Sequence, residues 1–424
     1  MLTSYLNQIR GRPFIKNFVV LSGGSIFAQL ILFIVLPVIT RLYSEEDYGV
    51  YSLYNSILMV LVIPATLKYE LAIVLPKHDR DGANIVALCL IITTFFSVLL
   101  FGFIYLLEDT IQSIWPLGTY IFLIPVSVFF VGIFQTFNFW LNRKKEFAKL
   151  AAAKICRSSI MVASQSMFGF LNKLSSGLIL GLIAGQVVSS GFIVERSKKR
   201  IREFWDEVSL KKMWYLTKTY KKIPLLNTVI SILNMVSNQI PVLFFGVYFG
   251  ADILGNYGLA IRAILVPTSL ISLSFGQVFY QRAAEMYKKQ PADLYPFVRK
   301  VYKTLFLSGL PFFILLGLFA PFLFGLYFGE KWVFAGEFSR LLVPWLFLVF
   351  MNSPVSYIVT ILGKQQQMVL YDASLLIMRT AGLIAGYWIF GDPWYSVLFY
   401  ALVGFVFNLY FTIFLIRMAK QNEN

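Results

Sequence analysis

The sequence predicts an all-α integral membrane protein, with twelve transmembrane helices in two parallel-repeat bundles of six around a central cavity. Three observations predict this class. Hydrophobic residues make up 58% of the 424 residues and charged residues only 14%, whereas soluble domains average roughly 45–50% and about 25%. The apolar residues form repeated runs of about 20 residues, the length that crosses ~30 Å of hydrocarbon as a helix. One basic segment, residues 195–222, divides these runs into six and six.

Each predicted span is an apolar run that ends at polar or charged residues. Before the basic segment the spans cover about 17–39, 48–75, 84–107, 118–141, 148–170 and 174–194, and after it about 223–249, 257–281, 301–327, 339–361, 369–390 and 395–417. The first run is too long for a cleaved signal peptide. We therefore expect an N-terminal six-helix lobe (1–195), a cytoplasmic basic linker (196–222) and a C-terminal six-helix lobe (223–424).

The distribution of Lys and Arg predicts the orientation. Loops on the side of the N-terminus hold 28 of the 37 cations, and the opposite loops hold four. Because Lys and Arg in short loops are retained in the cytoplasm, both termini are expected there, in a multi-pass protein. The formal net charge of +16 lies at one membrane face. It therefore favours anionic membrane lipids and phosphate-bearing substrates as partners, and not nucleic acid.

Within the linker, apolar residues recur at helical spacing among charged ones. They are Ile201, Phe204, Trp205 and Val208. This pattern predicts an amphipathic helix that lies in the plane of the lipid headgroups. A solvated linker without such a helix is the alternative.

The two halves show a weak internal repeat. A shift of 209 residues places 47–50 on 256–259, and Gln29 on Asn238. Six spans per half put both halves the same way up in the membrane, as in transporters built from parallel repeats. The interface between two such bundles is where an alternating-access carrier would hold its substrate.

Seven charged residues lie inside predicted spans, five of them cations: Lys68, Lys154, Arg157, Arg262 and Arg379, with the anions Glu70 and Asp372. Such residues are costly in hydrocarbon and usually face a bundle interior or a wet cavity. Pairing between helices is the alternative role, but two anions cannot neutralise five cations. We therefore predict that the five cations bind an anionic substrate such as a phosphate. The two anions are candidates for coupling to an ion gradient.

Polar stripes mark the first span of each half. Span 7 carries Asn234 and Asn238 one helical turn apart, and span 1 carries Ser25 and Gln29 at the same spacing. Such stripes either hold helices together or line a cavity. Their presence at corresponding places favours a lining role, so these four residues join the predicted substrate-binding set.

Several kinds of chemistry lack a motif in this sequence. It contains no P-loop, no paired-carboxylate motif and no metal-ligand spacing, and its single histidine, His78, lies in a short charged loop. Cys89 and Cys156 lie within apolar runs, where they are packing residues. We therefore predict no catalytic residues, no metal and no cofactor, and a protein that is not an enzyme.

Five stretches resemble a known family, and the resemblance extends over essentially the whole chain. Residues 41–57, 67–88, 220–231, 274–285 and 328–345 are similar to polysaccharide flippases of the O-antigen translocase (Wzx) type, in the multidrug/oligosaccharidyl-lipid/polysaccharide (MOP) exporter superfamily. The resemblance implies a two-lobed carrier with a cationic cavity in the bacterial cytoplasmic (inner) membrane. Such a carrier turns an undecaprenyl-diphosphate-linked oligosaccharide from the cytoplasmic to the outer leaflet, for cell-surface polysaccharide biosynthesis. Other membrane proteins of polysaccharide assembly are further candidate partners.

Two other functions compete with a flippase. A small-molecule or drug antiporter of the same superfamily is expected to favour acidic cavities, whereas the predicted spans here hold an excess of Lys and Arg. A polymerase or ligase acting on the same lipid-linked sugars needs a sizeable loop outside the cytoplasm. The longest predicted outward loops have about eleven residues.

Overall fold

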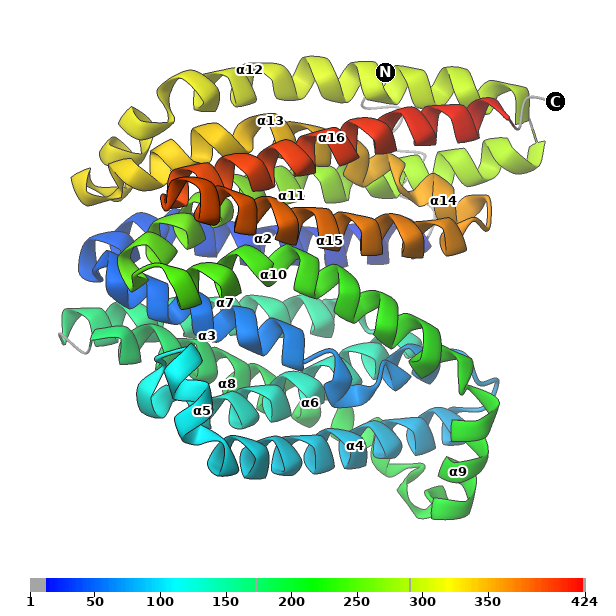
Figure 1. Ribbon diagram of the computed structural model, residues 1–424. Coiled ribbons are helices and arrows are strands. Elements are labelled where there is room, and N and C mark those ends of the chain that lie inside the picture. Colours follow the sequence, from blue (N-terminus) through cyan, green and yellow to red (C-terminus); the bar gives the residue numbers. More distant parts are fainter. Residues whose placement is uncertain (1–12, 172–173, 290, 422–424) are drawn as a thin grey trace. The chain divides into compact units, whose positions relative to one another are not determined.

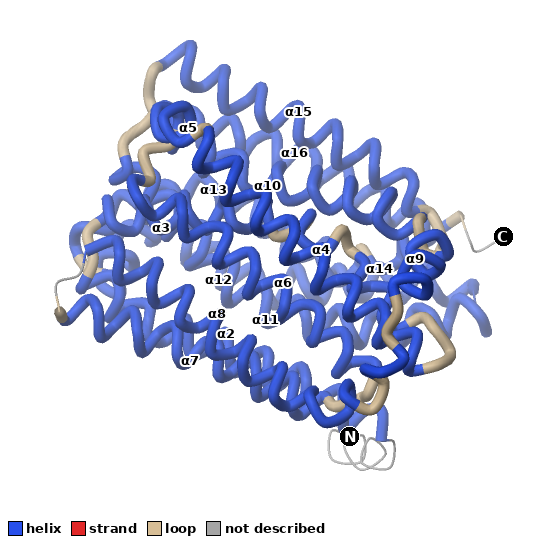
Figure 2. Tube along the Cα trace, turned by 90° about the horizontal axis from the view of Figure 1, so that it is seen from below, coloured by secondary structure: helices blue, strands red, loops and turns tan. Residues whose placement is uncertain are grey.

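The computed structural model describes residues 13–171, 174–289 and 291–421. Helices account for nearly all of these residues, and no strand occurs among them (Figure 2). The predicted all-α class is confirmed. An all-helical chain suits hydrocarbon, because a helix satisfies its own backbone N–H and C=O groups where no water is available.

Every predicted span contains a long helix. Those of the first half are α2 (Pro13–Leu42), α3 (Glu45–Leu61), α4 (Asp79–Leu106), α6 (Ile124–Arg143), α7 (Phe147–Phe170) and α8 (Leu174–Arg202). Those of the second half are α10 (Val229–Tyr248), α11 (Ala251–Lys289), α12 (Leu294–Phe328), α13 (Val333–Val355), α15 (Gln365–Phe390) and α16 (Pro393–Lys420). Three shorter helices, α5 (Glu108–Ile114), α9 (Leu210–Thr219) and α14 (Tyr357–Ile361), lie between them. The order is shown by colour in Figure 1.

Eleven helices of the described ranges are long and apolar enough to cross a membrane. The predicted span outside this set is α7, which has 24 residues and therefore sufficient length. Its polarity is high because Lys154, Arg157 and Gln165 lie within it. The one predicted span outside the set of eleven is therefore the one that carries two of the predicted site cations.

The second predicted span differs from the continuous helix expected over 48–75. Helix α3 ends at Leu61, and two 3₁₀ turns, Pro64–Thr66 and Tyr69–Val74, follow it. Between them Leu67 and Lys68 have positive φ values of 48° and 58°. The break has a local cause, because proline cannot donate a backbone hydrogen bond within a helix and its ring clashes with the preceding turn.

The linker also differs from the expected pattern. Helix α8 continues to Arg202, a 3₁₀ turn covers Trp205–Glu207, and the surface helix is α9. Ser209 sets this start, since its side chain accepts a hydrogen bond from the backbone N–H of Lys212 at 3.3 Å, which is the N-cap role that serine favours. The linker helix therefore begins after the residues whose spacing predicted it.

The chain forms two compact units. Unit 1 comprises Met1–Tyr43 and Leu53–Met235, and unit 2 comprises Ser44–Ser52 and Val236–Asn424. The division falls within α3 and α10, so the first turns of α3 belong to unit 2 and the first turns of α10 to unit 1.

The helices of the two units have the same order of neighbours. In unit 1, α4 packs on α6, α6 on α8, and α8 on α7, which also packs on α2. In unit 2, the corresponding helices α12, α13, α16 and α15 pack in the same sequence. This repetition agrees with the internal repeat detected between the two halves of the sequence.

In unit 2, the beginnings of α3 and α11 meet through glycines. A Cβ placed on Gly49 would lie 1.8 Å from the carbonyl oxygen of Ala251, and one on Gly255 would lie 1.9 Å from that of Glu45. Only glycine permits this approach, and small residues are the usual means by which membrane helices come close.

A buried polar network joins three helices of unit 2. The hydroxyls of Tyr302 and Thr412 donate to Oδ1 of Asn352 at 2.9 and 2.8 Å, and Nδ2 of Asn352 donates to the carbonyl oxygen of Asn408 at 2.9 Å. These bonds connect α12, α13 and α16. Asn352 thus provides hydrogen-bond partners for polar groups of α12 and α16, which have no water to bond to in hydrocarbon.

The glycine contact predicts a large effect of Gly255→Leu on stability. The side chain would have to displace the backbone of α3, and overpacking of this kind costs about 1–3 kcal/mol. The thermal unfolding midpoint in detergent should fall by several degrees. Gly191→Leu is the matched control, since a Cβ there meets nothing within 4 Å. Equal midpoints for the two variants would contradict the close packing.

The polar network predicts that Asn352→Leu destabilises the protein. Three interhelical hydrogen bonds are lost, and at ~0.6 kcal/mol each their loss amounts to about 2 kcal/mol. The thermal midpoint should fall well below that of Thr304→Val. Thr304 is an exposed residue of α12 whose hydroxyl donates only within its own helix, to Lys300. A midpoint unchanged from the native protein would show that the network carries no stability.

Candidate functional site

The cations predicted to lie within spans are divided between the two units. Lys68, Lys154 and Arg157 belong to unit 1, and Arg262 and Arg379 belong to unit 2. Each unit therefore contributes cationic side chains from its membrane helices. The surroundings of these cations differ.

Lys154 and Ser25 meet in unit 1. Nζ of Lys154 on α7 donates to Oγ of Ser25 on α2 at 3.0 Å. The two helices come close at this level, because a Cβ on Gly24 would lie 2.3 Å from that of Ala151. Two residues predicted separately from the sequence are thus in direct contact.

Arg157 and Gln29 extend this polar region. Arg157 lies three residues after Lys154, on the same side of α7, and its guanidinium carbon is 5.8 Å from the ring centre of Phe134 on α6. Gln29 follows Ser25 by one turn of α2, and both Gln29 and Arg157 are partly exposed. We call Ser25, Gln29, Lys154 and Arg157 the unit 1 cluster.

Lys68 and Glu70 lie apart from this cluster along the chain, at the break after α3. Nζ of Lys68 is 3.8 Å from Oε1 of Glu70. The buried Glu70 also accepts a hydrogen bond from the hydroxyl of Thr66 at 2.5 Å. This geometry favours the pairing role that the sequence left open for Lys68 over binding of substrate.

Arg262 of unit 2 is held by two tyrosines. Its Nη1 donates to the hydroxyls of Tyr48 at 3.2 Å and Tyr51 at 3.5 Å, and its guanidinium carbon lies 5.9 Å from the ring centre of Tyr51. The tyrosines come from the first turns of α3 and Arg262 from α11, where Gly49 and Gly255 bring these helices together. Neutral hydroxyls satisfy part of the guanidinium without cancelling its charge.

Arg379 is almost fully buried, with 2% of its surface exposed. Its guanidinium carbon lies 4.5 Å from the ring centre of Trp345 and 4.9 Å from that of Tyr400. Nη1 donates to the hydroxyl of Ser237 at 3.5 Å, and Nε has no hydrogen-bond partner in the described ranges. Asp372 lies two turns earlier on the same helix and is also buried. Aromatic faces stabilise the arginine here by cation–π attraction.

The two arginines of unit 2 keep an uncompensated charge. Within the described parts of the chain, neither Arg262 nor Arg379 forms an ion pair with a carboxylate. A guanidinium has five N–H donors, and its planar fork matches the oxygens of a phosphate. The arrangement is therefore suited to binding an anion. Among the described residues no group of three potential ligands could hold a metal ion.

The two asparagines predicted from the polar stripe of α10 are exposed. Asn234 is counted with unit 1 and Asn238 with unit 2. The neighbouring Ser237 is buried and binds Arg379, and its carbonyl oxygen accepts the hydroxyl of Tyr400 at 3.4 Å. Sequence reasoning did not select Ser237, because it lies one position off the stripe.

The sequence also did not identify the aromatic partners of the cations: Tyr48, Tyr51, Phe134, Trp345 and Tyr400. A signal existed only for Tyr48, which belongs to the repeated Tyr-Gly pair at 48–49 and 257–258.

One feature is common to both units. A cation from the fifth span of each half, Lys154 or Arg379, donates to a serine on the first span of the same half, Ser25 or Ser237.

Comparison with solved structures shows the fold. The lipid II flippase MurJ in an inward closed conformation matches 94% of this chain over 87% of its own, with a TM-score of 0.74 and 11% identity. An inward-facing multidrug resistance MATE transporter of the MOP superfamily matches 93% over 96%, with a TM-score of 0.67 and 15% identity. A mutant of the MATE transporter VcmN from Vibrio cholerae matches 96% over 97%, with a TM-score of 0.62 and 14% identity. One of these proteins is described as a flippase and two as transporters, and at these identities the similarity establishes the fold alone.

No curated protein matched the chain. A family model described as "Polysaccharide biosynthesis protein" matches residues 38–336, which is well over half of the sequence. The chain therefore belongs to this polysaccharide biosynthesis protein family, and it has the multi-pass membrane fold of the MOP-superfamily flippases and transporters.

Proposed function

We propose that this protein is a flippase for a lipid-linked oligosaccharide, built on undecaprenyl diphosphate. It would move the molecule from the cytoplasmic to the outer leaflet of the bacterial inner membrane by alternating access, for cell-surface polysaccharide biosynthesis. Family membership and the fold support a transport role in polysaccharide assembly. The choice of substrate rests on the charge of the membrane helices.

The observation that carries this choice is the environment of Arg379. A buried guanidinium without a carboxylate partner is costly unless an anion reaches it. For Arg379 that cost is reduced by contacts with Trp345, Tyr400 and Ser237. These contacts leave the Nε–H group of Arg379 without a hydrogen bond in the described parts of the chain. A diphosphate supplies the missing negative charge and several acceptor oxygens.

The unit 1 cluster supports the same substrate. Lys154 and Arg157 add positive charge from α7, and Ser25 and Gln29 add hydrogen-bonding groups from α2. Asn234 and Asn238 present exposed amides on α10. Hydroxyl and amide groups of this kind bond to sugar hydroxyls, whereas the cations bind phosphate. In this mechanism the diphosphate and glycan follow a wet path while the polyprenyl chain stays in lipid, because a charged group in hydrocarbon is costly.

A small-molecule antiporter is the second candidate. The structural similarity to MATE transporters supports it, since several of the matching structures are described as MATE proteins. Export of cationic drugs requires acidic groups in the path. Only two acids, Glu70 and Asp372, were predicted within spans, against five cations, and Glu70 lies near Lys68. The excess of positive charge therefore favours an anionic substrate.

A transport prediction concerns Arg157→Met together with Arg379→Met. Methionine fills much of the volume of arginine and removes its charge, so the loss of charged hydrogen bonds, about 1.5–3 kcal/mol each, should slow translocation at least tenfold per arginine. The measurement is transfer of a short-chain diphosphate-linked oligosaccharide into the lumen of proteoliposomes.

Arg340→Met is the matched control for this double variant. Arg340 is an exposed arginine that pairs with Glu337 at 3.2 Å, and its loss should leave transfer unchanged. The thermal midpoints of all variants establish that they are folded. Native transfer by the folded double variant would rule out these two arginines as binding groups. Transport of a cationic dye in place of the oligosaccharide by the native protein would support the antiporter.

A further prediction concerns coupling to an ion gradient. Glu70→Gln and Asp372→Asn each remove an acid that could carry a proton or a sodium ion. If either acid couples transport, its amide variant should transport at the same rate with and without an imposed gradient, whereas the native protein is accelerated. An unchanged gradient dependence in the variant combining both changes would exclude both residues.

A further inference from the structure

Helix α9 of unit 1 exposes a row of large apolar side chains. Leu210, Trp214 and Tyr215 have 77%, 64% and 61% of their surface exposed. Leu210 and Trp214 are one helical turn apart and therefore share a face. Half of Trp205, in the turn before α9, is exposed as well. The described parts of the chain leave these side chains uncovered.

The same segment is strongly basic. Residues 209–222 contain five lysines and no acidic residue. Nζ of Lys218 lies 5.1 Å from the ring centre of Trp214, and Nζ of Lys212 lies 5.5 Å from that of Tyr215. Aromatic rings and lysines are thus intermixed on one surface. This combination is typical of helices that lie in the headgroup region of a membrane.

The opposite face of α9 is packed on unit 1. Met213 and Leu216 are buried, and Leu216 belongs to a hydrophobic cluster with Ile201 and Trp140. The hydroxyl of Tyr69 also donates to the carbonyl oxygen of Thr217 at 3.3 Å. The helix is therefore amphipathic in three dimensions, with one face in the protein and the other facing outward.

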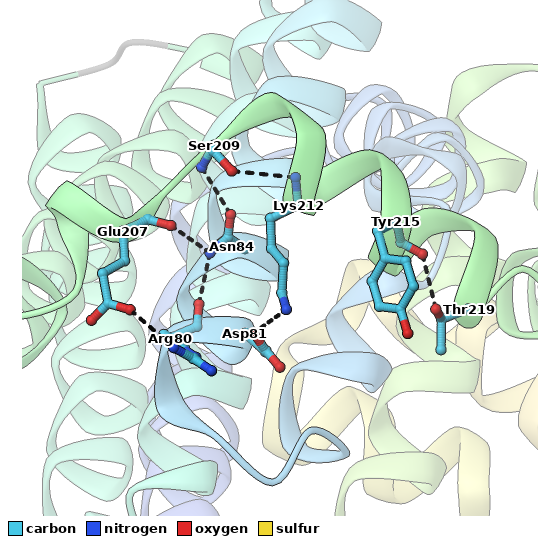
Figure 3. A network of polar contacts seen from close by, with 8 residues as sticks. All are labelled: Arg80, Asp81, Asn84, Glu207, Ser209, Lys212, Tyr215 and Thr219. Carbon is cyan, nitrogen blue, oxygen red and sulfur yellow. Dashed lines mark hydrogen bonds and ion pairs between the residues drawn. The ribbon is translucent and has the colours of Figure 1, made fainter.

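Asn84 holds the beginning of α9 to the first turns of α4. Its side chain is buried, and all of its bonds are drawn in Figure 3: Nδ2 donates to the carbonyl oxygens of Arg80 at 2.8 Å and Glu207 at 3.2 Å, and Oδ1 accepts from the backbone N–H of Ser209 at 3.0 Å. Lys212 adds an ion pair to Asp81 at 3.2 Å. Both the amide nitrogen and the amide oxygen of Asn84 are used, so the position of α9 on unit 1 is well defined.

The location of α9 relative to the membrane follows from α4. Figure 1 shows α9 at the end where α4 begins, running across the long helices of unit 1, with α5 at the other end. The excess of Lys and Arg identifies the end that carries α9 as cytoplasmic. A helix across this end lies at the level of the inner-leaflet headgroups.

We infer that α9 is an interfacial helix that binds anionic phospholipids of the cytoplasmic leaflet. Leu210, Trp214 and Tyr215 enter the boundary between headgroups and acyl chains, while Lys211 and Lys218 bind lipid phosphates. Charge identifies the occupant, because a segment with five lysines and no acid complements an anionic bilayer surface. This inference is independent of the transported substrate, since it concerns a surface that the proposed transport path does not use.

The test places a nitroxide spin label at Trp214→Cys in the full-length protein carrying Cys89→Ala and Cys156→Ala, reconstituted in bilayers with phosphatidylglycerol. Accessibility of the label to dissolved oxygen and to a water-soluble nickel chelate is measured. A label in the headgroup boundary is reached by oxygen and protected from nickel. A control label at Lys198→Cys, an exposed position near the end of α8, should be reached by nickel.

Each alternative gives a different result. A label at position 214 that nickel reaches as readily as at position 198 would place α9 in water and overturn the inference. Protection from both reagents would indicate that another protein or a second copy covers the helix, and would also overturn it.

Two further variants test the charge and the attachment. The protection from nickel should be greater in phosphatidylglycerol than in phosphatidylcholine, and Lys211→Gln with Lys218→Gln should abolish that difference. The control pair Lys300→Gln with Lys303→Gln, on α12, should retain that difference. Equal protection of the native sequence in both lipids would refute the role of anionic headgroups.

The attachment of α9 is tested by Asn84→Ala. This change should broaden the distribution of label mobility, because it releases the backbone of Ser209.

Discussion

The absence of water in the hydrocarbon region is the constraint on which this structure depends. Backbone groups must be satisfied within helices, and side-chain polar groups must find partners in the protein. Asn352 illustrates the second requirement, since one amide connects Tyr302, Thr412 and Asn408. The non-helical backbone at Leu67 and Lys68 illustrates the first, because turns of 3₁₀ helix on both sides maintain hydrogen bonding after α3 ends.

The same constraint explains how the membrane helices hold positive charge. Arg262 and Arg379 are surrounded by aromatic rings and hydroxyls, which offset part of the cost of burial and leave the charge in place. A carboxylate partner would have neutralised them. Lys68 shows the contrast, because Glu70 lies beside it. A cation with an anionic partner, such as Lys68, is a candidate for a structural pair. A cation without one among the described residues, such as Arg379, is a candidate for binding substrate.

The two units repeat one order of helix neighbours, and each connects a cation of its fifth span with a serine of its first. The chemistry has diverged around that common feature. Unit 1 offers a lysine bonded to a serine beside a partly exposed arginine, whereas unit 2 offers a buried arginine that contacts aromatic rings. Outside the spans, the linker is attached to unit 1 through Asn84 and Leu216, so the basic surface of α9 is part of that unit.

The sequence by itself determined the helical membrane class, the approximate limits of the spans and the identity of the charged residues within them. These depend on local properties, namely the length of each apolar run and the cost of each charge. Tertiary structure alone decided which cations have partners. Tyr48 lies 214 residues before Arg262, and Ser237 lies 142 before Arg379. Spacing along one helix indicates which residues share a face, but it does not indicate which other helix that face meets. The position of α9 was decided in the same way, by a hydrogen bond between Asn84 and a backbone group 125 residues away.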